Sequence, residues 1–140
     1  MVQVKRKMHN TLKAELPRLG FGCMRLPQKD GKIDREAADA MVAEALRSGV
    51  NYFDTAYTYH AGESELYIGE ALSRYPRADY RLATKMPTWL FDGTEEKVES
   101  LFHEQLERCR VDYFDFYLLH NLYTERVAEM KKCGAYEYLR

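Results

Sequence analysis

Several polar residues of the sequence stand where apolar runs end. Asp54 follows the run VNYF, Lys85 follows RLAT and His120 follows DFYLL. Tyr59 comes five residues after Asp54, in the segment FDTAYTYHAGE. Each residue alone has an ordinary explanation, as a turn cap, a surface lysine, a loop histidine or a packing tyrosine. In parallel α/β folds the active site is built by the connections after the carboxyl ends of the strands. The repeated occurrence of polar residues at these strand ends therefore favours a catalytic site.

These four side chains suit proton transfer to a carbonyl group. A neutral tyrosine can protonate a carbonyl oxygen that gains negative charge, but its free pKa of about 10 makes it a weak donor at neutral pH. A lysine ammonium beside the phenol lowers that pKa, and a carboxylate paired with the lysine keeps it charged and in place. An imidazole can donate a hydrogen bond to the same oxygen. We predict carbonyl reduction by hydride from a cofactor, with no metal, and catalytic residues Asp54, Tyr59, Lys85 and His120.

Alternating strands and helices must position these groups. We expect a strand that closes in a loop within residues 17–27, and strands over 50–55, 80–86 and 111–120. We expect helices from Asp34 to about Ser48, from Ser64 to Pro76 and from Thr94 to about Cys109, and a further helix over about 125–140. Apolar stripes at helical spacing mark the first three helices: Ala38, Met41, Val42, Ala45 and Leu46; Ile68, Ala71, Leu72 and Tyr75; Val98, Leu101, Phe102, Leu106 and Cys109. The alternation predicts an α/β fold of about four βα units around a parallel sheet.

Length and composition limit the possible classes of protein. The 140 residues are 46% hydrophobic and 31% charged, as expected for a single globular domain over 1–140. The net charge of −1 argues against nucleic acid or an anionic membrane as partner. Three separated cysteines with no metal-ligand spacing indicate idle thiols in a reducing compartment. Without an apolar leader or a membrane-length apolar run, the expected location is the cytoplasm.

The segments LGFGCMRLP, GVNYFDTAYTYHAGESELYIGEAL, LATK and DYFDFYLLHN together resemble the aldo-keto reductases, NADP-dependent enzymes built on a (β/α)8 TIM-type barrel. The resemblance runs from about Leu16 to the end of the chain. It implies that Tyr59 is the general acid/base, that Lys85 and Asp54 tune it, and that His120 orients the substrate. It also implies that the nicotinamide and its ribose lie near Gly22, Cys23, Met24 and Asp54. Some similar members carry a C-terminal iron–sulfur segment, which this sequence lacks.

The length of the chain conflicts with a complete barrel, which needs roughly 250 residues. We therefore expect the N-terminal half of a barrel, truncated to about four strands. Its two open sheet edges, and an inner face with Phe114, Phe116 and Leu118, predict self-association. One hypothesis is an NADP-dependent reductase of a small aldehyde or ketone, weak or inactive as the isolated chain. The other is a non-catalytic half barrel, either an association module or an inert truncated product.

Some neighbouring residues have two possible roles. Tyr57 and His60 flank the proposed acid, where they either pack the loop or line a substrate pocket. Trp89 and Phe91 follow Lys85, where they form either an aromatic wall for an apolar substrate or a cover over the barrel mouth. Cys23 has no neighbouring base in the sequence, so we predict an inert thiol.

Overall fold

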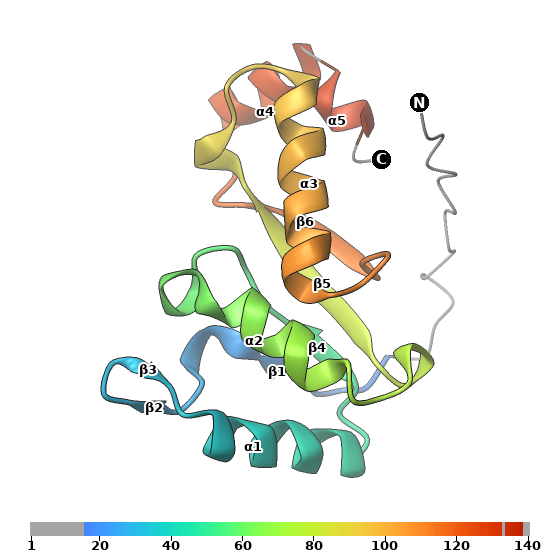
Figure 1. Ribbon diagram of the computed structural model, residues 1–140. Helices are drawn as coiled ribbons and strands as arrows, with labels where there is room; N and C mark the ends of the chain where they lie inside the picture. Colours follow the sequence, from blue (N-terminus) through green and yellow to red (C-terminus); the bar gives the residue numbers. More distant parts are fainter. Residues whose placement is uncertain (1–15, 133, 139–140) are drawn as a thin grey trace.

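The computed structural model describes residues 16–132 and 134–138. Its main sheet has four parallel strands in the order β1-β4-β5-β6 (Figure 1). These strands are β1 (Phe21–Gly22), β4 (Tyr52–Asp54), β5 (Arg81–Pro87) and β6 (Phe116–His120). Asp54 pairs with Ala83 and Lys85 pairs with Leu118, so the carboxyl ends of the strands lie at one edge of the sheet. The predicted parallel α/β fold is confirmed.

Three long helices lie on one side of this sheet (Figure 1). They are α1 (Arg35–Arg47), α2 (Glu63–Leu72) and α3 (Glu95–Cys109). The N-caps predicted for α1 and α3 are confirmed, because Asp34 accepts a hydrogen bond from the Ala37 amide and Thr94 accepts one from the Lys97 amide, each at 3.2 Å. Side chains alternate across the sheet, with Phe53 and Leu82 buried beneath the helices and Asp54 and Lys85 on the opposite, inner face.

The strand predicted to close in a loop within residues 17–27 is short. Only Phe21–Gly22 pair with β4, and the chain then forms the 3₁₀ helix η2 (Cys23–Arg25). An antiparallel hairpin follows, made of β2 (Gln28–Lys29) and β3 (Lys32–Ile33). Its turn residues Asp30 and Gly31 have φ of 52° and 77°, values typical of a two-residue Asp-Gly hairpin turn.

The starts of the second predicted helix and of the fourth predicted strand also differ from the prediction. Helix α2 begins at Glu63 with Gly62 as N-cap, so the prediction of Ser64 as N-cap was wrong. The Ser64 hydroxyl instead lies 2.9 Å from Thr55 Oγ1 and donates to the Cys23 carbonyl oxygen. Strand β6 begins at Phe116 and not at Val111, because the Asp115 carboxylate accepts the Leu82 amide hydrogen bond at 2.8 Å.

The C-terminal segment forms two short helices instead of one. Helix α4 (Thr124–Lys132) and helix α5 (Ala135–Tyr138) are separated by Gly134, whose φ is 81°. The remaining short 3₁₀ helices are η3 (Tyr59–Gly62), η4 (Arg77–Asp79) and η5 (Thr88–Leu90). Figure 1 places α4 and α5 beside the start of α3, where α5 packs on α3.

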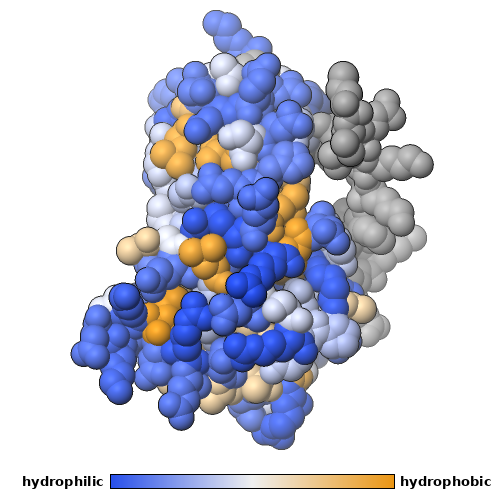
Figure 2. All heavy atoms as spheres, in the orientation of Figure 1, coloured by the Kyte–Doolittle hydropathy of each residue, from blue (hydrophilic) through white to orange (hydrophobic). Residues whose placement is uncertain are grey.

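The hydrophobic core forms two clusters beneath the helices. The larger one joins β4, α1 and α2 around Phe53 and Ile68, and the smaller one joins β5, α3 and α4 around Met86 and Met130. Met41, which was expected in the buried stripe of α1, is 44% exposed, so that stripe is narrower than predicted. The outer face of the helices is mostly hydrophilic, with hydrophobic atoms in small separate patches (Figure 2).

Candidate active site

The Lys85 ammonium is the centre of the candidate site, at the carboxyl edge of the sheet. Its Nζ donates to Asp54 Oδ1 at 2.6 Å, to the Thr55 carbonyl oxygen at 2.8 Å and to the Tyr59 hydroxyl at 3.2 Å. These three acceptors match the three protons of an ammonium group. The Lys85 side chain is 13% exposed, which limits competition from water. Because the phenol oxygen accepts the lysine hydrogen bond, Tyr59 retains its own proton for donation.

His120 lies beside Tyr59 at the end of β6. The two ring centroids are 5.9 Å apart with perpendicular planes. Burial lowers the pKa of His120, the Lys85 ammonium lowers it further, and Asp54 opposes both effects. His120 is therefore neutral at neutral pH and carries a single N–H. Its Nδ1 is buried and has no hydrogen-bond partner among the residues that the structure describes.

The segment predicted to contact a cofactor borders the same edge. Gly22 pairs with Asp54 across β1 and β4, and a Cβ at Gly22 would meet no atom within 4 Å. Met24 is 60% exposed, whereas the Cys23 side chain is fully buried. Burial, with a smaller contribution from Asp54, raises the pKa of the Cys23 thiol to about 12. Cys23 is buried as a whole residue and its carbonyl oxygen accepts a hydrogen bond from Ser64, so the exposed residues of this segment are Gly22 and Met24.

The aromatic residues near the site divide between lining and packing. Trp89 is 41% exposed and its ring lies 5.2 Å from the His120 ring, so it stands at the mouth of the site. Phe91 belongs to the smaller core cluster and is 7% exposed. Tyr57 donates its hydroxyl proton to Glu104 at 2.8 Å on α3, a hydrogen bond that raises the pKa of Tyr57. Tyr57 and Phe91 thus pack the scaffold.

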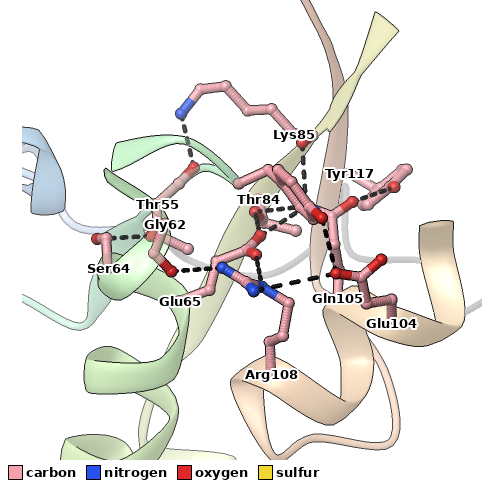
Figure 3. Close-up of polar contacts among 11 residues, drawn as sticks. Thr55, Gly62, Ser64, Glu65, Thr84, Lys85, Glu104, Gln105, Arg108 and Tyr117 are labelled. Atoms are coloured by element: carbon pink, nitrogen blue, oxygen red, sulfur yellow. Dashed lines mark hydrogen bonds and ion pairs between the residues drawn. The ribbon is translucent and has the colours of Figure 1, made fainter. Parts of the chain in front are cut away.

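A buried polar network supports the site from the helix side (Figure 3). The fully buried Glu65 accepts hydrogen bonds from Thr84 at 2.6 Å, Gln105 at 2.5 Å and Arg108 at 2.7 Å. Gln105 Nε2 also donates to the Lys85 carbonyl oxygen at 3.1 Å. The network therefore ties α2 and α3 to the backbone of the strand that carries Lys85.

The sequence interpretation found Asp54, Tyr59, Lys85 and His120, and the structure brings all four together. It missed the supporting residues Glu65, Gln105 and Arg108. One signal was available, because Gln105 and Arg108 lie three residues apart on the helix face that also carries Leu101. Polar residues in an apolar stripe require buried partners.

The residues that the structure describes include no cluster of three or more His, Cys, Asp or Glu side chains placed to hold a metal ion. Within the same residues, no helix combines the length and the apolar composition needed to cross a membrane. Cys109 is buried like Cys23, while Cys133 lies outside the described residues.

Sequence comparison links the chain to known proteins. The model of the aldo/keto reductase family matches residues 18–133. A Glycine max protein named "Probable aldo-keto reductase 1" is 34% identical, over 84% of this chain and 38% of its own length. L-galactose dehydrogenase of Arabidopsis thaliana is 37% identical, over 74% of this chain and 34% of its own. The NADH-specific methylglyoxal reductase of Escherichia coli is 32% identical, over 75% and 38%.

Solved structures give the same grouping. An aldo-keto reductase from Klebsiella pneumoniae in complex with NADPH superposes with a TM-score of 0.67 and 26% identity, over 86% of this chain and 42% of that one. The holo form of aldo-keto reductase AKR11C1 from Bacillus halodurans gives 0.63 and 32%, over 84% and 43%. The chain thus spans less than half the length of these relatives.

Proposed function

The chain belongs to the aldo/keto reductase family, and from this premise we propose that it carries the catalytic groups of a nicotinamide-dependent carbonyl reductase. The observation that carries the proposal is the placement of the Lys85 ammonium between Asp54 and Tyr59. A cation within hydrogen-bond distance of both a carboxylate and a phenol stabilises the phenolate, and so favours transfer of the phenolic proton.

Each side chain has a role in this proposal. Tyr59 donates its proton to the carbonyl oxygen of the substrate as negative charge develops there. The Lys85 ammonium stabilises the phenolate that remains, and Asp54 keeps the ammonium charged and oriented. His120, neutral at neutral pH, donates its N–H to the same carbonyl oxygen and fixes the orientation of the substrate. Trp89 borders the space in which the substrate would lie.

The residues at the end of β1 fit the reactive end of NADPH. The open space beside Gly22 and the exposed Met24 leave room for a flat ring next to Asp54. When bound, NADPH supplies the hydride that reaches the carbonyl carbon. Gly22, Met24 and Asp54 would hold this end of the cofactor, and the buried Cys23 would support their positions.

The proposed substrates are small aldehydes and ketones. The names of the relatives include one NADH-specific reductase and one structure with NADPH, so both cofactors belong in the test. We expect weak activity from the 140-residue chain alone, because it spans less than half the length of its relatives.

The decisive experiment measures cofactor binding by the chain and the effect on turnover of removing the Tyr59 hydroxyl group. Fluorescence titration of the chain with NADPH and with NADH should show saturable binding at micromolar concentration. Turnover of a reactive aldehyde should fall by about 100-fold or more in Tyr59→Phe, because the transferable proton is lost. Tyr75→Phe is the matched control, since Tyr75 packs against the core beyond the other end of α2. Activity that survives in Tyr59→Phe would reject Tyr59 as the acid.

A second candidate function is association without catalysis. It is favoured by the inner face of the sheet, where Leu118 is 40% exposed, and by the two edge strands β1 and β6. A flat cofactor titration together with a stable oligomer of the chain would favour this candidate.

A further inference from the structure

The backbone directly after Tyr59 adopts an unusual conformation. His60, Ala61 and Gly62 have φ of 53°, 54° and 91°, so three successive residues are left-handed. Such conformations are costly for residues other than glycine and persist only where the surroundings over-determine them. This left-handed turn sets the direction in which the chain presents the Tyr59 ring, so whatever holds the turn also places the phenol.

One side of the turn is held by His60. The Leu26 amide donates to His60 Nε2 at 3.1 Å, and Gln28 Nε2 lies 2.6 Å from His60 Nδ1. Because Nε2 accepts from the Leu26 amide, Nδ1 carries the ring proton and can only donate, so the side-chain amide of Gln28 must turn its oxygen toward Nδ1. Both nitrogens of the ring then bind the segment that leads from η2 into the β2–β3 hairpin. A ring that binds two points of a separate segment cannot rotate without breaking both contacts.

The other side of the turn is held by Arg108. Its Nη2 donates to the Gly62 carbonyl oxygen, and its Nε donates to the fully buried Glu65 carboxylate at 2.7 Å (Figure 3). The guanidinium carbon also lies 4.7 Å from the centroid of the Tyr57 ring, which precedes Tyr59 by two residues. Arg108 thus contacts the chain before and after Tyr59, and the Glu65 network prevents the guanidinium from moving.

We propose that His60 and Arg108 act as positioning residues, which clamp the left-handed turn from two sides and so hold the Tyr59 hydroxyl against Lys85. The catalytic consequence rests on the function proposed above, whereas the structural consequence does not. Neither residue needs to touch substrate or cofactor. The clamp explains how a strained loop keeps a phenol oxygen 3.2 Å from an ammonium on a different element.

The test uses the full chain with ¹³Cζ-labelled tyrosine. The Tyr59 signal is identified by its loss in Tyr59→Phe, and Lys85→Met shows where that signal moves when the ammonium is absent. We expect His60→Ala and Arg108→Lys each to move the Tyr59 signal most of the way to its position in Lys85→Met. Lysine keeps the charge toward Glu65 but cannot also reach the Gly62 carbonyl oxygen with a rigid fork.

Two further variants separate positioning from a general loss of fold. His60→Gln places an amide oxygen near the position of Nε2, so it should restore the signal that His60→Ala shifts. Arg47→Lys, on the exposed surface of α1, should leave it unchanged. Far-UV circular dichroism checks that each variant is folded. The two clamp residues are substituted in separate variants, so if one variant unfolds, the Tyr59 signal of the other still tests the proposal.

The outcomes distinguish the clamp from the function on which it rests. An unmoved Tyr59 signal in a folded His60→Ala or Arg108→Lys variant, with a clear shift in Lys85→Met, would overturn the clamp alone. A signal that Lys85→Met also leaves in place would reject the Lys85–Tyr59 contact and with it the proposed function. Where turnover is measurable, the clamp variants should lose about 100-fold in kcat with little change in the KM for NADPH, as for a misplaced catalytic group.

Discussion

At the scale of single residues, the candidate site combines one half-buried phenol with several groups held in fixed states by their surroundings. Lys85 is saturated with acceptors, Cys23 is buried with a raised thiol pKa, and His120 is kept neutral by burial and by Lys85. Among these groups, the Tyr59 hydroxyl accepts a hydrogen bond from the Lys85 ammonium and keeps its own proton available to donate. This arrangement is why we propose Tyr59, and not Asp54, Lys85 or His120, as the group that transfers the proton.

The pH dependence of stability should reveal the state of His120. Because its pKa in the folded chain lies below the usual value of about 6.5, the unfolded chain binds more protons as the pH falls through this range. The contribution is complete above the unfolded pKa and is lost as the pH falls through the folded pKa. Urea unfolding at pH 7.5 and pH 5.5 should therefore show a larger loss of unfolding free energy in the wild type than in His120→Gln.

The control for this measurement is Leu66→Gln on α2, which changes a 46% exposed residue and removes no titratable group. It should follow the wild-type pH dependence closely. Equal losses of unfolding free energy in wild type and His120→Gln would contradict a lowered pKa for His120.

The sequence was sufficient to predict Asp54, Tyr59, Lys85 and His120 because strand ends can be located from apolar runs, and parallel strands bring their ends together. It was not sufficient to predict the clamp. His60 was left open between packing and lining, because its partners at Leu26 and Gln28 depend on tertiary contacts over more than 30 positions. The left-handed φ of Ala61 has no signature in its residue type, since alanine rarely adopts it.

At the scale of elements, α2 and α3 are packed unusually closely at Gly69. A Cβ on Gly69 would lie 2.5 Å from the carbonyl carbon of Cys109 and 2.6 Å from its oxygen, distances that no real contact allows. This close approach brings Glu65 and Arg108 within reach of each other, since both lie one helical turn or less from the contact. The glycine is thus required for the network that holds the turn after Tyr59.

Gly69→Ala should destabilise the chain by about 1–3 kcal/mol, because the backbone of α3 must move away from α2. Gly22→Ala is a matched control for stability, since the same methyl group enters open space at an ordinary φ of −89°. Chemical unfolding of both variants measures the difference. A Gly69→Ala variant as stable as Gly22→Ala would show that the two helices are not in backbone contact.

Element boundaries were less predictable than element existence. The caps at Asp34 and Thr94 follow from residue type alone, whereas the start of β6 depends on a hydrogen bond from the Leu82 amide to Asp115 across the sheet. The β2–β3 hairpin had a readable signal in QKDGKI, because Asp-Gly is a preferred pair for a two-residue turn.

At the scale of the whole molecule, the sheet is covered on one face only by the elements that the structure describes. Strands β1 and β6 are its edges, and the inner face presents Leu118 at 40% exposure between the catalytic candidates. Relatives more than twice as long share this portion of the fold. Edge strands with unpaired backbone groups pair readily with a second copy of the same chain.

We therefore predict that the purified 140-residue chain forms a dimer or larger oligomer through the inner face and its edges. Light scattering after size exclusion should give at least twice the monomer mass. Leu118→Lys should shift the chain toward monomer, because a charge on the inner face opposes association. Leu66→Lys, on the hydrophilic helix side and 46% exposed, is the matched control. A compact wild-type monomer with a sharp thermal transition would contradict the prediction.

The four candidate catalytic side chains lie between Asp54 and His120, within one uninterrupted stretch of the polypeptide. Their spacing depends on the register of β4, β5 and β6, on helices α2 and α3, and on the contacts of His60 with Leu26 and Gln28 earlier in the chain. A genetic exchange downstream of His120 would replace everything that follows without separating the phenol from its ammonium. The segment from Phe21 to His120 therefore contains the described elements on which the proposed proton transfer depends, so exchange of the segments after it would leave that step in place.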